Sequence, residues 1–321
     1  MTPGNKVKMR IILIRLVHMF DSLPRRRLLG AAAVTTLAGL AAPLARAAEG
    51  WQTATLPLAR QHDLKSAITG QHYRIFVAVP SGPVPAAGHP VLYALDGNAT
   101  FPTLALMGRT AGVRSSVTGQ TPPVIVGIGY AGDQPWNSAR GRDYTPPTGK
   151  AGPATEGGAD LFLDFIDKEL KPLVATLAPL DPARQALYGH SYGGLCTLHA
   201  LFTRPAMFQT WLAASPSIWY GERAVLSGMD GFAKRIAALP AKPSLMLTVG
   251  ELEQPAVGKV ALEGREAIAA KRRMVDEARE LAGRLQADQT LARVRFHLLA
   301  HENHGSAMFP AMARGLEFFL A

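Results

Sequence analysis

The sequence predicts an α/β domain with a mostly parallel sheet of about eight strands and helices on both faces. Short strand-like apolar runs alternate along the chain with longer segments of helical period. The composition, 48% hydrophobic and 18% charged, is typical of a well-packed soluble protein. No internal repeat interrupts the alternation. We therefore assign one folded domain, residues 48–321.

Residues 1–47 differ in composition from the rest and are predicted to be an export signal. The stretch Pro24-Arg25-Arg26-Arg27-Leu28-Leu29 precedes an alanine-rich apolar run, and Ala45-Arg46-Ala47 matches an A-x-A cleavage pattern. This combination resembles a twin-arginine signal, which predicts a transient contact with the twin-arginine translocase and a periplasmic location. An uncleaved inner-membrane anchor is the alternative, but the apolar run barely reaches the length of a membrane span.

The leader also explains most of the net charge of +10. Residues 1–47 contain eight of the 34 Lys and Arg residues and one of the 24 acidic residues, which leaves +3 on the remainder. No basic stripe with interleaved aromatics remains, so nucleic acid is not an expected partner. The single cysteine, Cys196, excludes an intramolecular disulfide, and its apolar helical surroundings predict a buried side chain.

The strands are predicted from short apolar or alternating runs. HYRIFVAVP alternates and is expected to pair with the preceding run as a hairpin, whereas PVLYALDG and PPVIVGIGY are continuous apolar runs typical of buried strands. The predicted strands span residues 51–58, 72–80, 90–97, 122–130, 185–189, 210–215, 243–250 and 292–300.

Helices are predicted between these strands, at residues 100–111, 159–177, 193–203, 222–238, 259–286 and 307–320. Helix 159–177 has an inner apolar row, and Pro172 is expected to kink or divide it. Residues 131–158 are rich in Gly, Pro and polar residues and show neither period. A loop of that length inside a compact domain is usually functional or disordered.

The candidate reaction centre is a serine between glycines. Gly189-His190-Ser191-Tyr192-Gly193 matches G-x-S-x-G, in which a strand turns so sharply into a helix that the serine oxygen stays exposed. The alternative is a plain glycine-rich turn. Ser191 stands where a predicted buried strand ends and a crossover helix begins, and this position favours a nucleophile.

A serine nucleophile needs a base, and the base needs an acid that holds its tautomer. The loop after the last strand offers His301 and His304; we favour His304, because the small residues that follow it let a ring approach Ser191. The loop after strand 243–250 offers Glu251 and Glu253. We favour Glu253, which leaves the chain room to turn toward the histidine loop.

Two backbone N–H groups are expected to stabilise an oxyanion. One belongs to Tyr192, directly after the nucleophile, and the other to Asn98, in the turn that follows strand 90–97. The composition of this Asp-Gly-Asn segment also suits an ordinary turn. Its position after the third strand favours the functional interpretation.

With these parts in order, the chain resembles the esterase D-like branch of the α/β-hydrolases, and within it the bacterial siderophore esterases that cleave enterobactin or bacillibactin. The resemblance extends over most of residues 72–320. The stretches that carry it are LYALDGN (92–98), VIVGIGY (124–130), RGRDYTP (140–146), GHSYGG (189–194), ASPSIWY (214–220), GELEQ (250–254) and ENHGS (302–306).

The resemblance implies an α/β-hydrolase fold with Ser191, His304 and Glu253 as the catalytic residues, and no metal or organic cofactor. Some siderophore esterases look like Ser-His dyads with a weakly engaged acid. The implied substrate is a small-molecule ester, with iron arriving only as part of a ferric siderophore. The substrate-binding candidates are two cations for anionic catecholates and three aromatic walls, namely Arg140, Arg142, Trp136, Trp219 and Tyr220.

Three other functions remain compatible with the same residues. A general or feruloyl-type carboxylesterase and an acyltransferase would use the same catalytic serine. A catalytically inactive hydrolase fold that binds siderophores or glycans belongs to a different class. The complete set of serine, acid, histidine and oxyanion loop favours an enzyme, while the identity of the ester depends on pocket shape.

Overall fold

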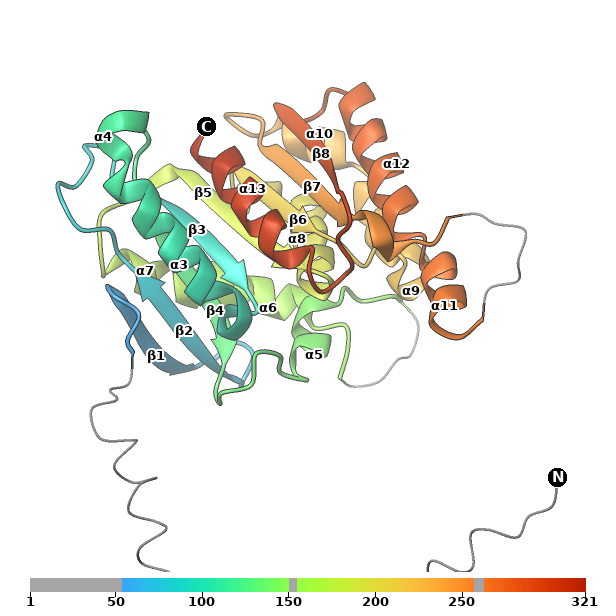
Figure 1. Ribbon diagram of the computed structural model, residues 1–321, viewed down its shortest axis with the longest axis horizontal. Helices are drawn as coiled ribbons and strands as arrows, with labels where there is room; N and C mark the ends of the chain where they lie inside the picture. Colours follow the sequence, from blue (N-terminus) through green and yellow to red (C-terminus); the bar gives the residue numbers. More distant parts are fainter. Residues whose placement is uncertain (1–53, 150–154, 257–262) are drawn as a thin grey trace, which may run out of the picture. The chain divides into compact units, whose positions relative to one another are not determined.

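The computed structural model describes residues 54–149, 155–256 and 263–321, and they contain one eight-stranded sheet of order β1-β2-β4-β3-β5-β6-β7-β8 (Figure 1). β2 runs antiparallel to both of its neighbours, β1 and β4, and the other neighbouring strands pair in parallel. The predicted fold class is therefore confirmed. The strands are β1 (Ala59–Lys65), β2 (His72–Ala78), β3 (His89–Leu95), β4 (Val124–Tyr130), β5 (Leu180–His190), β6 (Thr210–Ala214), β7 (Ser244–Gly250) and β8 (Arg293–Leu299).

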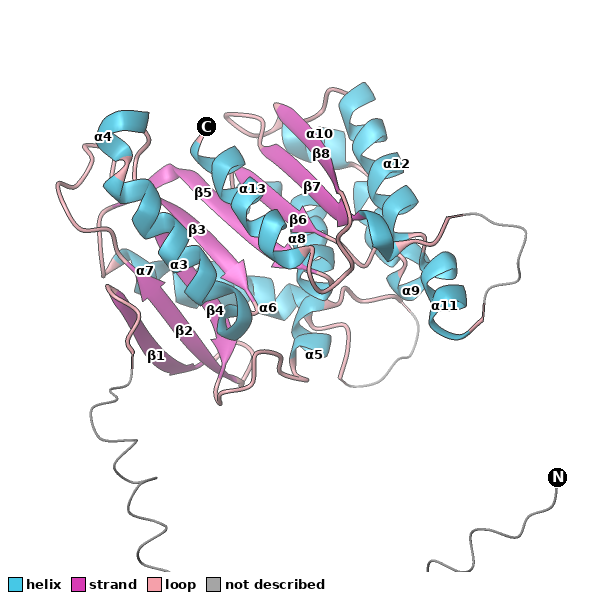
Figure 2. Ribbon diagram, in the orientation of Figure 1, coloured by secondary structure: helices cyan, strands magenta, loops and turns pink. Residues whose placement is uncertain are grey.

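The central strands are buried on both faces by helices (Figure 2). One face packs against α3 (Gly97–Val113) and α13 (Met308–Leu320). The other packs against α6 (Ala159–Phe165), α8 (Tyr192–Thr203), α10 (Phe232–Ala237) and α12 (Met274–Ala287). Two apolar layers thus hold the sheet, and parallel strands that are covered on both faces are expected to read as continuous apolar runs. This is why β3 and β4 were recognisable in the sequence.

The first strand was predicted at the wrong place. Residues 54–58 are not a strand, and the segment that pairs with β2 is β1, at Ala59–Lys65. β1 is an edge strand whose side chains are mostly exposed. Because such a strand is held by backbone hydrogen bonds to one neighbour, it needs no apolar face, and the hydrophobic pattern could not locate it.

Three predicted helices are interrupted. A π-helical segment, Ile166–Leu170, separates α6 from α7 (Lys171–Ala175), and Pro172, which has no N–H to donate to the preceding turn, follows this segment as the second residue of α7. The predicted helix 222–238 is split into α9 (Tyr220–Arg223), a 3-10 segment (Ala224–Met229) and α10. The predicted helix 259–286 breaks at Arg273 into α11 (Gly264–Arg272) and α12.

The long segment after β4 carries a short helix, α5 (Arg140–Tyr144), which packs against α6 and α8. Asp143 is buried and accepts hydrogen bonds from the hydroxyls of Tyr73 (3.1 Å) and Tyr130 (3.0 Å). The Tyr144 hydroxyl accepts one from the N–H of Asp96 (3.0 Å). These contacts fix part of the segment beside the ends of β3 and β4. A further short helix, α4 (Ser115–Thr118), directly follows α3 in the chain.

Within the described residues, no helix combines the length and the apolar character needed to cross a membrane. The predicted export signal, residues 1–47, lies outside the described residues.

Candidate active site

Ser191 lies between β5 and α8 in a backbone conformation that few side chains adopt. Its φ is 61° and its ψ is −116°, and its N–H donates a hydrogen bond to the carbonyl of Ala214 at the end of β6 (3.0 Å). Such a conformation costs about 1–3 kcal/mol and persists only where the surroundings enforce it. The sharp turn predicted from G-x-S-x-G is therefore present.

The glycines around Ser191 are required by close approach of backbone segments. A Cβ atom at Gly189 would lie 2.2 Å from the carbonyl oxygen of Gly193, and one at Gly194 would lie 2.7 Å from the carbonyl oxygen of Ala214. No side chain fits at either distance. These two glycines let α8 start directly against β5, so that Ser191 stands in the turn between the strand and the helix.

His304 lies in the loop between β8 and α13 and contacts both Ser191 and Glu253. Its Nε2 atom is 3.0 Å from the Oγ atom of Ser191, and its Nδ1 atom is 2.6 Å from Oε2 of Glu253. The other histidine of the loop, His301, has a 93% exposed side chain, and its Nδ1 atom lies 3.8 Å from Glu251. The structure thus pairs one histidine with each glutamate and brings only His304 to the serine.

Glu253 ends the 3-10 turn Glu251–Glu253 after β7 and is buried. Its Oε1 atom accepts hydrogen bonds from the hydroxyl of Ser215 (2.5 Å) and from the N–H of Gly250 (2.7 Å). Burial by itself would raise the pKa of Glu253, but the hydrogen bond and charge of His304, with these two donors, bring it below its ordinary value. The carboxylate is therefore ionised and acts only as an acceptor.

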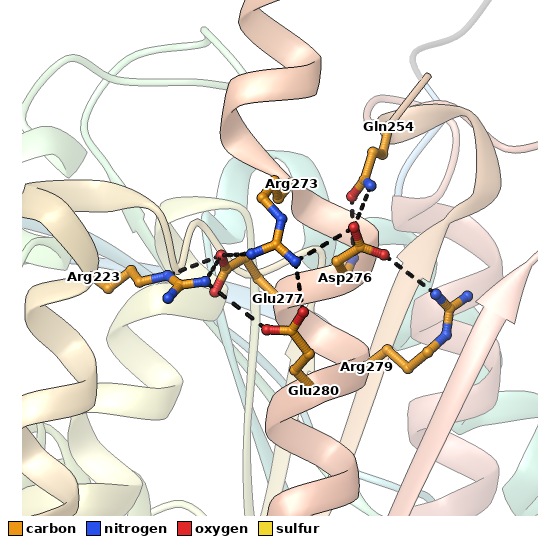
Figure 3. Close-up of polar contacts among 7 residues, drawn as sticks. All are labelled: Arg223, Gln254, Arg273, Asp276, Glu277, Arg279 and Glu280. Atoms are coloured by element: carbon orange, nitrogen blue, oxygen red, sulfur yellow. Dashed lines mark hydrogen bonds and ion pairs between the residues drawn. The ribbon is translucent and has the colours of Figure 1, made fainter. Parts of the chain in front are cut away.

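The residue after the acid anchors this turn to α12 (Figure 3). The side-chain amide of Gln254 donates to the carboxylate of Asp276 (2.6 Å), and its oxygen accepts the backbone N–H of Asp276 (3.1 Å). Two opposed hydrogen bonds fix an amide in one orientation. Glu253 is thus held in place by the hydrogen bonds to its own carboxylate and by those of the neighbouring Gln254. The role of Gln254 was not predicted from the sequence.

Sequence reasoning also missed a role for His190. Its ring is buried, and its centroid lies 4.8 Å from that of the His304 ring at an interplanar angle of 39°. Within the described chain, its Nε2 atom has no hydrogen-bond partner. Burial, followed by the proximity of His304, lowers the pKa of His190 to about 3. A neutral ring therefore packs against the histidine that contacts the serine.

The two predicted oxyanion donors begin two different helices. Tyr192 is the first residue of α8 and Asn98 the second residue of α3, and N–H groups in a first helical turn have no intrahelical acceptor. The Asn98 side chain binds the end of β4, donating to the carbonyl of Tyr130 (3.1 Å) and accepting the Tyr130 N–H (2.9 Å). This clamp fixes the turn that carries the Asn98 N–H.

A cleft of about 670 Å³ opens beside Ser191 and His304. Tyr192 and Trp219 form part of its wall and also border a second cleft of about 670 Å³, which contains Tyr220. Of the predicted aromatic residues, Trp219 therefore lines the cleft that holds Ser191, whereas Tyr220 lines the second cleft alone. Further lining residues of the first cleft come from α11 and the start of α12, namely Arg265, Ile268, Ala269, Arg272 and Met274.

The arginines predicted to bind substrate are placed differently from expectation. Arg140 lines the first cleft, but its guanidinium donates to both carboxylate oxygens of the buried Asp96 (2.8 and 2.9 Å). Trp136 is 44% exposed and lies against Arg140, 5.6 Å from ring centroid to guanidinium carbon, outside both cleft walls. Arg142 pairs with Asp143 (2.7 Å) and lines neither cleft. The structure does not bring Arg142 to the site.

The comparisons with known proteins agree with this geometry. Residues 66–285 match the model of the Esterase family, which covers more than half of the chain. The chain belongs to this family. The esterase is 37% identical to the ferri-bacillibactin esterase BesA of Bacillus subtilis over 83% of its own length and 91% of the relative's.

Two further similarities point to the same group. A siderophore enterobactin esterase of Emericella nidulans is 36% identical to the esterase, over 77% of this chain and 88% of the relative. The crystal structure of the BES protein from Bacillus cereus superposes with a TM-score of 0.75 at 32% identity, over 84% of this chain and 98% of that one. The predicted resemblance to siderophore esterases and the predicted class, a serine hydrolase, are confirmed.

In residues 54–149, 155–256 and 263–321, no group of three or more His, Cys, Asp or Glu side chains is arranged to hold a metal ion. The absence of a resident cofactor stays a prediction.

Proposed function

We propose that this esterase hydrolyses the ester bonds of a siderophore through an acyl-enzyme on Ser191. The observation that carries the proposal is the continuous contact from Ser191 through His304 to the buried Glu253. The relatives named as esterases of ferri-bacillibactin and enterobactin support a siderophore as the substrate. In this proposal iron enters and leaves with the substrate.

The proton positions follow from the acceptor-only carboxylate. Because ionised Glu253 cannot donate, the Nδ1 atom of His304 carries a proton toward it, and the Nε2 atom is left as an acceptor for the Ser191 hydroxyl. As Oγ attacks the ester carbonyl, its proton passes to Nε2, and the imidazolium that forms is stabilised by Glu253. The imidazolium then protonates the departing alcohol oxygen.

Water completes the reaction by the same proton path. His304 accepts a proton from water as its oxygen attacks the acyl carbon, and it returns a proton to Oγ as the acid is released. In both steps the negative oxygen is stabilised by the N–H groups of Tyr192 and Asn98. Removing one such donor costs about 10²–10³-fold in kcat in other hydrolases.

We also propose that the protein is exported by the twin-arginine translocase and acts in the periplasm. The support is the sequence of residues 24–47, with its three arginines and A-x-A motif. Replacing Arg25, Arg26 and Arg27 together by lysine should retain the precursor in the cytoplasm in cell fractionation. Export of this variant at the wild-type level would contradict the signal assignment.

The function is tested by mass spectrometry of the products formed from apo and ferric enterobactin, beside a panel of simple aryl esters. The proposal expects linear dihydroxybenzoyl-serine products. It also expects Ser191→Ala and His304→Ala to lower turnover by about 10⁴-fold or more. Efficient cleavage of simple esters with no cleavage of enterobactin would identify a general carboxylesterase instead. Undiminished turnover by Ser191→Ala would contradict the mechanism itself.

A further inference from the structure

The helix α11 brings two arginines to the cleft that holds Ser191. Arg265 and Arg272 both line this cleft together with Ser191, Tyr192 and His304. Both arginine residues are exposed to solvent. Ile268 and Ala269, which lie between them on the same helix, and Met274 at the start of α12 also line the cleft. One helix thus supplies an apolar surface with a cation near each end.

These two arginines differ from Arg140 in having no acidic partner. Arg140 is neutralised by its two hydrogen bonds to Asp96. Among the described residues, neither Arg265 nor Arg272 lies within ion-pair distance of a carboxylate. The carboxylate that lines the cleft, Glu253, is engaged by His304. Among the residues that the structure describes, no carboxylate therefore neutralises these two positive charges of the cleft.

Arg272 is oriented by an aromatic ring. Its guanidinium carbon lies 4.2 Å from the ring centroid of Trp219, which also lines this cleft. A guanidinium stacked on a ring face is attracted by the ring, while its N–H donors, which lie in its own plane, stay available to an anion. Stacking also reduces the rotamer freedom that Arg272 would lose on binding. The arrangement suits a flat ligand with anionic oxygens.

The position of α11 is fixed at its end by Arg273 (Figure 3). This residue adopts a left-handed conformation (φ 47°, ψ 40°) between α11 and α12. Its guanidinium reaches three acids of α12, Glu280 at 2.6 Å, Glu277 at 3.4 Å and Asp276 at 3.6 Å. Glu277 also binds Arg223, and Asp276 binds Gln254 beside the catalytic acid. The break between α11 and α12 is thus connected, through Asp276 and Gln254, to the turn that carries Glu253.

We propose that Arg265 and Arg272 form an anion-binding wall that makes this enzyme prefer esters whose acyl part carries an aromatic group with anionic oxygens. The inference rests on the proposed acyl transfer at Ser191 and assigns its specificity to α11. A ring is expected to lie along the apolar residues of α11, with its charged oxygens facing the guanidinium groups. A neutral acyl group of the same shape gains only the apolar part of this contact.

The test compares two p-nitrophenyl esters that differ in one substituent, 4-carboxybenzoate and 4-methylbenzoate. Wild type should have the higher kcat/KM for the carboxylate. Arg265→Gln and Arg272→Gln should each lower that value about fivefold, as expected for a solvent-exposed charge contact, and leave the methyl ester within about twofold. Arg272→Lys should retain an intermediate preference. The preference should also fall as NaCl is raised, because salt screens exposed charges.

Arg284→Gln is the matched control, since Arg284 is an exposed arginine of α12 that does not line the cleft. It should leave both kcat/KM values unchanged. Equal effects of Arg265→Gln and Arg272→Gln on the two esters, or no effect on either, would overturn the inference while Ser191 still cleaves both. Failure of the proposed function would look different, because Ser191→Ala would then cleave both esters at the wild-type rate.

Discussion

The Nδ1 atom of His304 lies 2.6 Å from the Oε2 atom of Glu253. The other carboxylate oxygen of Glu253 accepts hydrogen bonds from the hydroxyl of Ser215 and the N–H of Gly250. The acid is thus fixed from one side and presents a single free oxygen to the imidazole. His301 and Glu251 form the other pair of these two loops, and it is exposed and more distant, at 3.8 Å. The two pairs therefore make a matched comparison within one molecule.

Glu253→Gln should lower kcat by about 10²–10⁴-fold, because a neutral amide does not stabilise the imidazolium and can favour the wrong tautomer of His304. Glu251→Gln is the control and should change kcat less than twofold. Steady-state hydrolysis of p-nitrophenyl butyrate measures both. A Glu253→Gln enzyme with more than a tenth of the wild-type kcat would show that Ser191 and His304 act as a dyad with a weakly engaged acid.

Gly189→Ala should destabilise the turn at Ser191. Its Cβ atom would lie 2.2 Å from the carbonyl oxygen of Gly193, so the strand and helix would have to separate, at a cost of about 2 kcal/mol or more. Gly283→Ala is the control, because Gly283 lies in α12 with no atom within 4 Å of an added Cβ. It should raise the free energy of unfolding by about 0.5–1 kcal/mol. Guanidinium chloride unfolding that ranks the two variants the other way would contradict the packing described at Gly189.

His190 should make the folded protein sensitive to acid. Its pKa is about 3 when folded and 6.5 ordinarily, so between these values the unfolded chain binds a proton that the folded protein does not. Stability then falls as pH falls through this window, by up to about 1.4 kcal/mol per pH unit. Between pH 6 and pH 5, wild type should lose about 1 kcal/mol more than His190→Gln. Equal losses in urea unfolding would show that the folded state accommodates a charged His190.

Arg273→Asn should loosen α11 without altering the chemistry at Ser191. Asparagine tolerates the left-handed conformation but cannot reach Glu277 or Glu280. We expect the preference for 4-carboxybenzoate over 4-methylbenzoate to decrease while kcat for the methyl ester stays within about threefold. Unchanged preference would mean that α11 keeps its place without the Arg273 contacts.

Most of the parallel sheet could be predicted because its strands are continuous apolar runs, such as Val124–Tyr130. The edge strand Ala59–Lys65 could not, because backbone pairing holds it and its side chains are mostly exposed. The break at Arg273 was equally hidden, since a non-glycine residue with φ 47° is held there by side-chain contacts with α12. Composition indicates an uninterrupted helix over this region.

The site residues show the same limit. Ser191, His304 and Glu253 were chosen from their places after successive strands, which topology brings to one sheet edge, and the structure places them in contact. Arg140 and Arg142 were chosen from the resemblance and from their charge. Arg140 is paired with Asp96, which is distant in the sequence, and Arg142 is paired with its buried neighbour Asp143. The sequence alone did not show that these two carboxylates neutralise the arginines. Arg265 and Arg272 gave no signal, because they resemble any exposed helical arginines.

The most direct measurement of the central claim is labelling by a fluorophosphonate, followed by mass spectrometry of the peptides. The account predicts one adduct, on Ser191, formed at a rate that falls by orders of magnitude in His304→Ala and not in His301→Ala. An adduct on another residue, or an Ser191 adduct formed equally fast without His304, would contradict it.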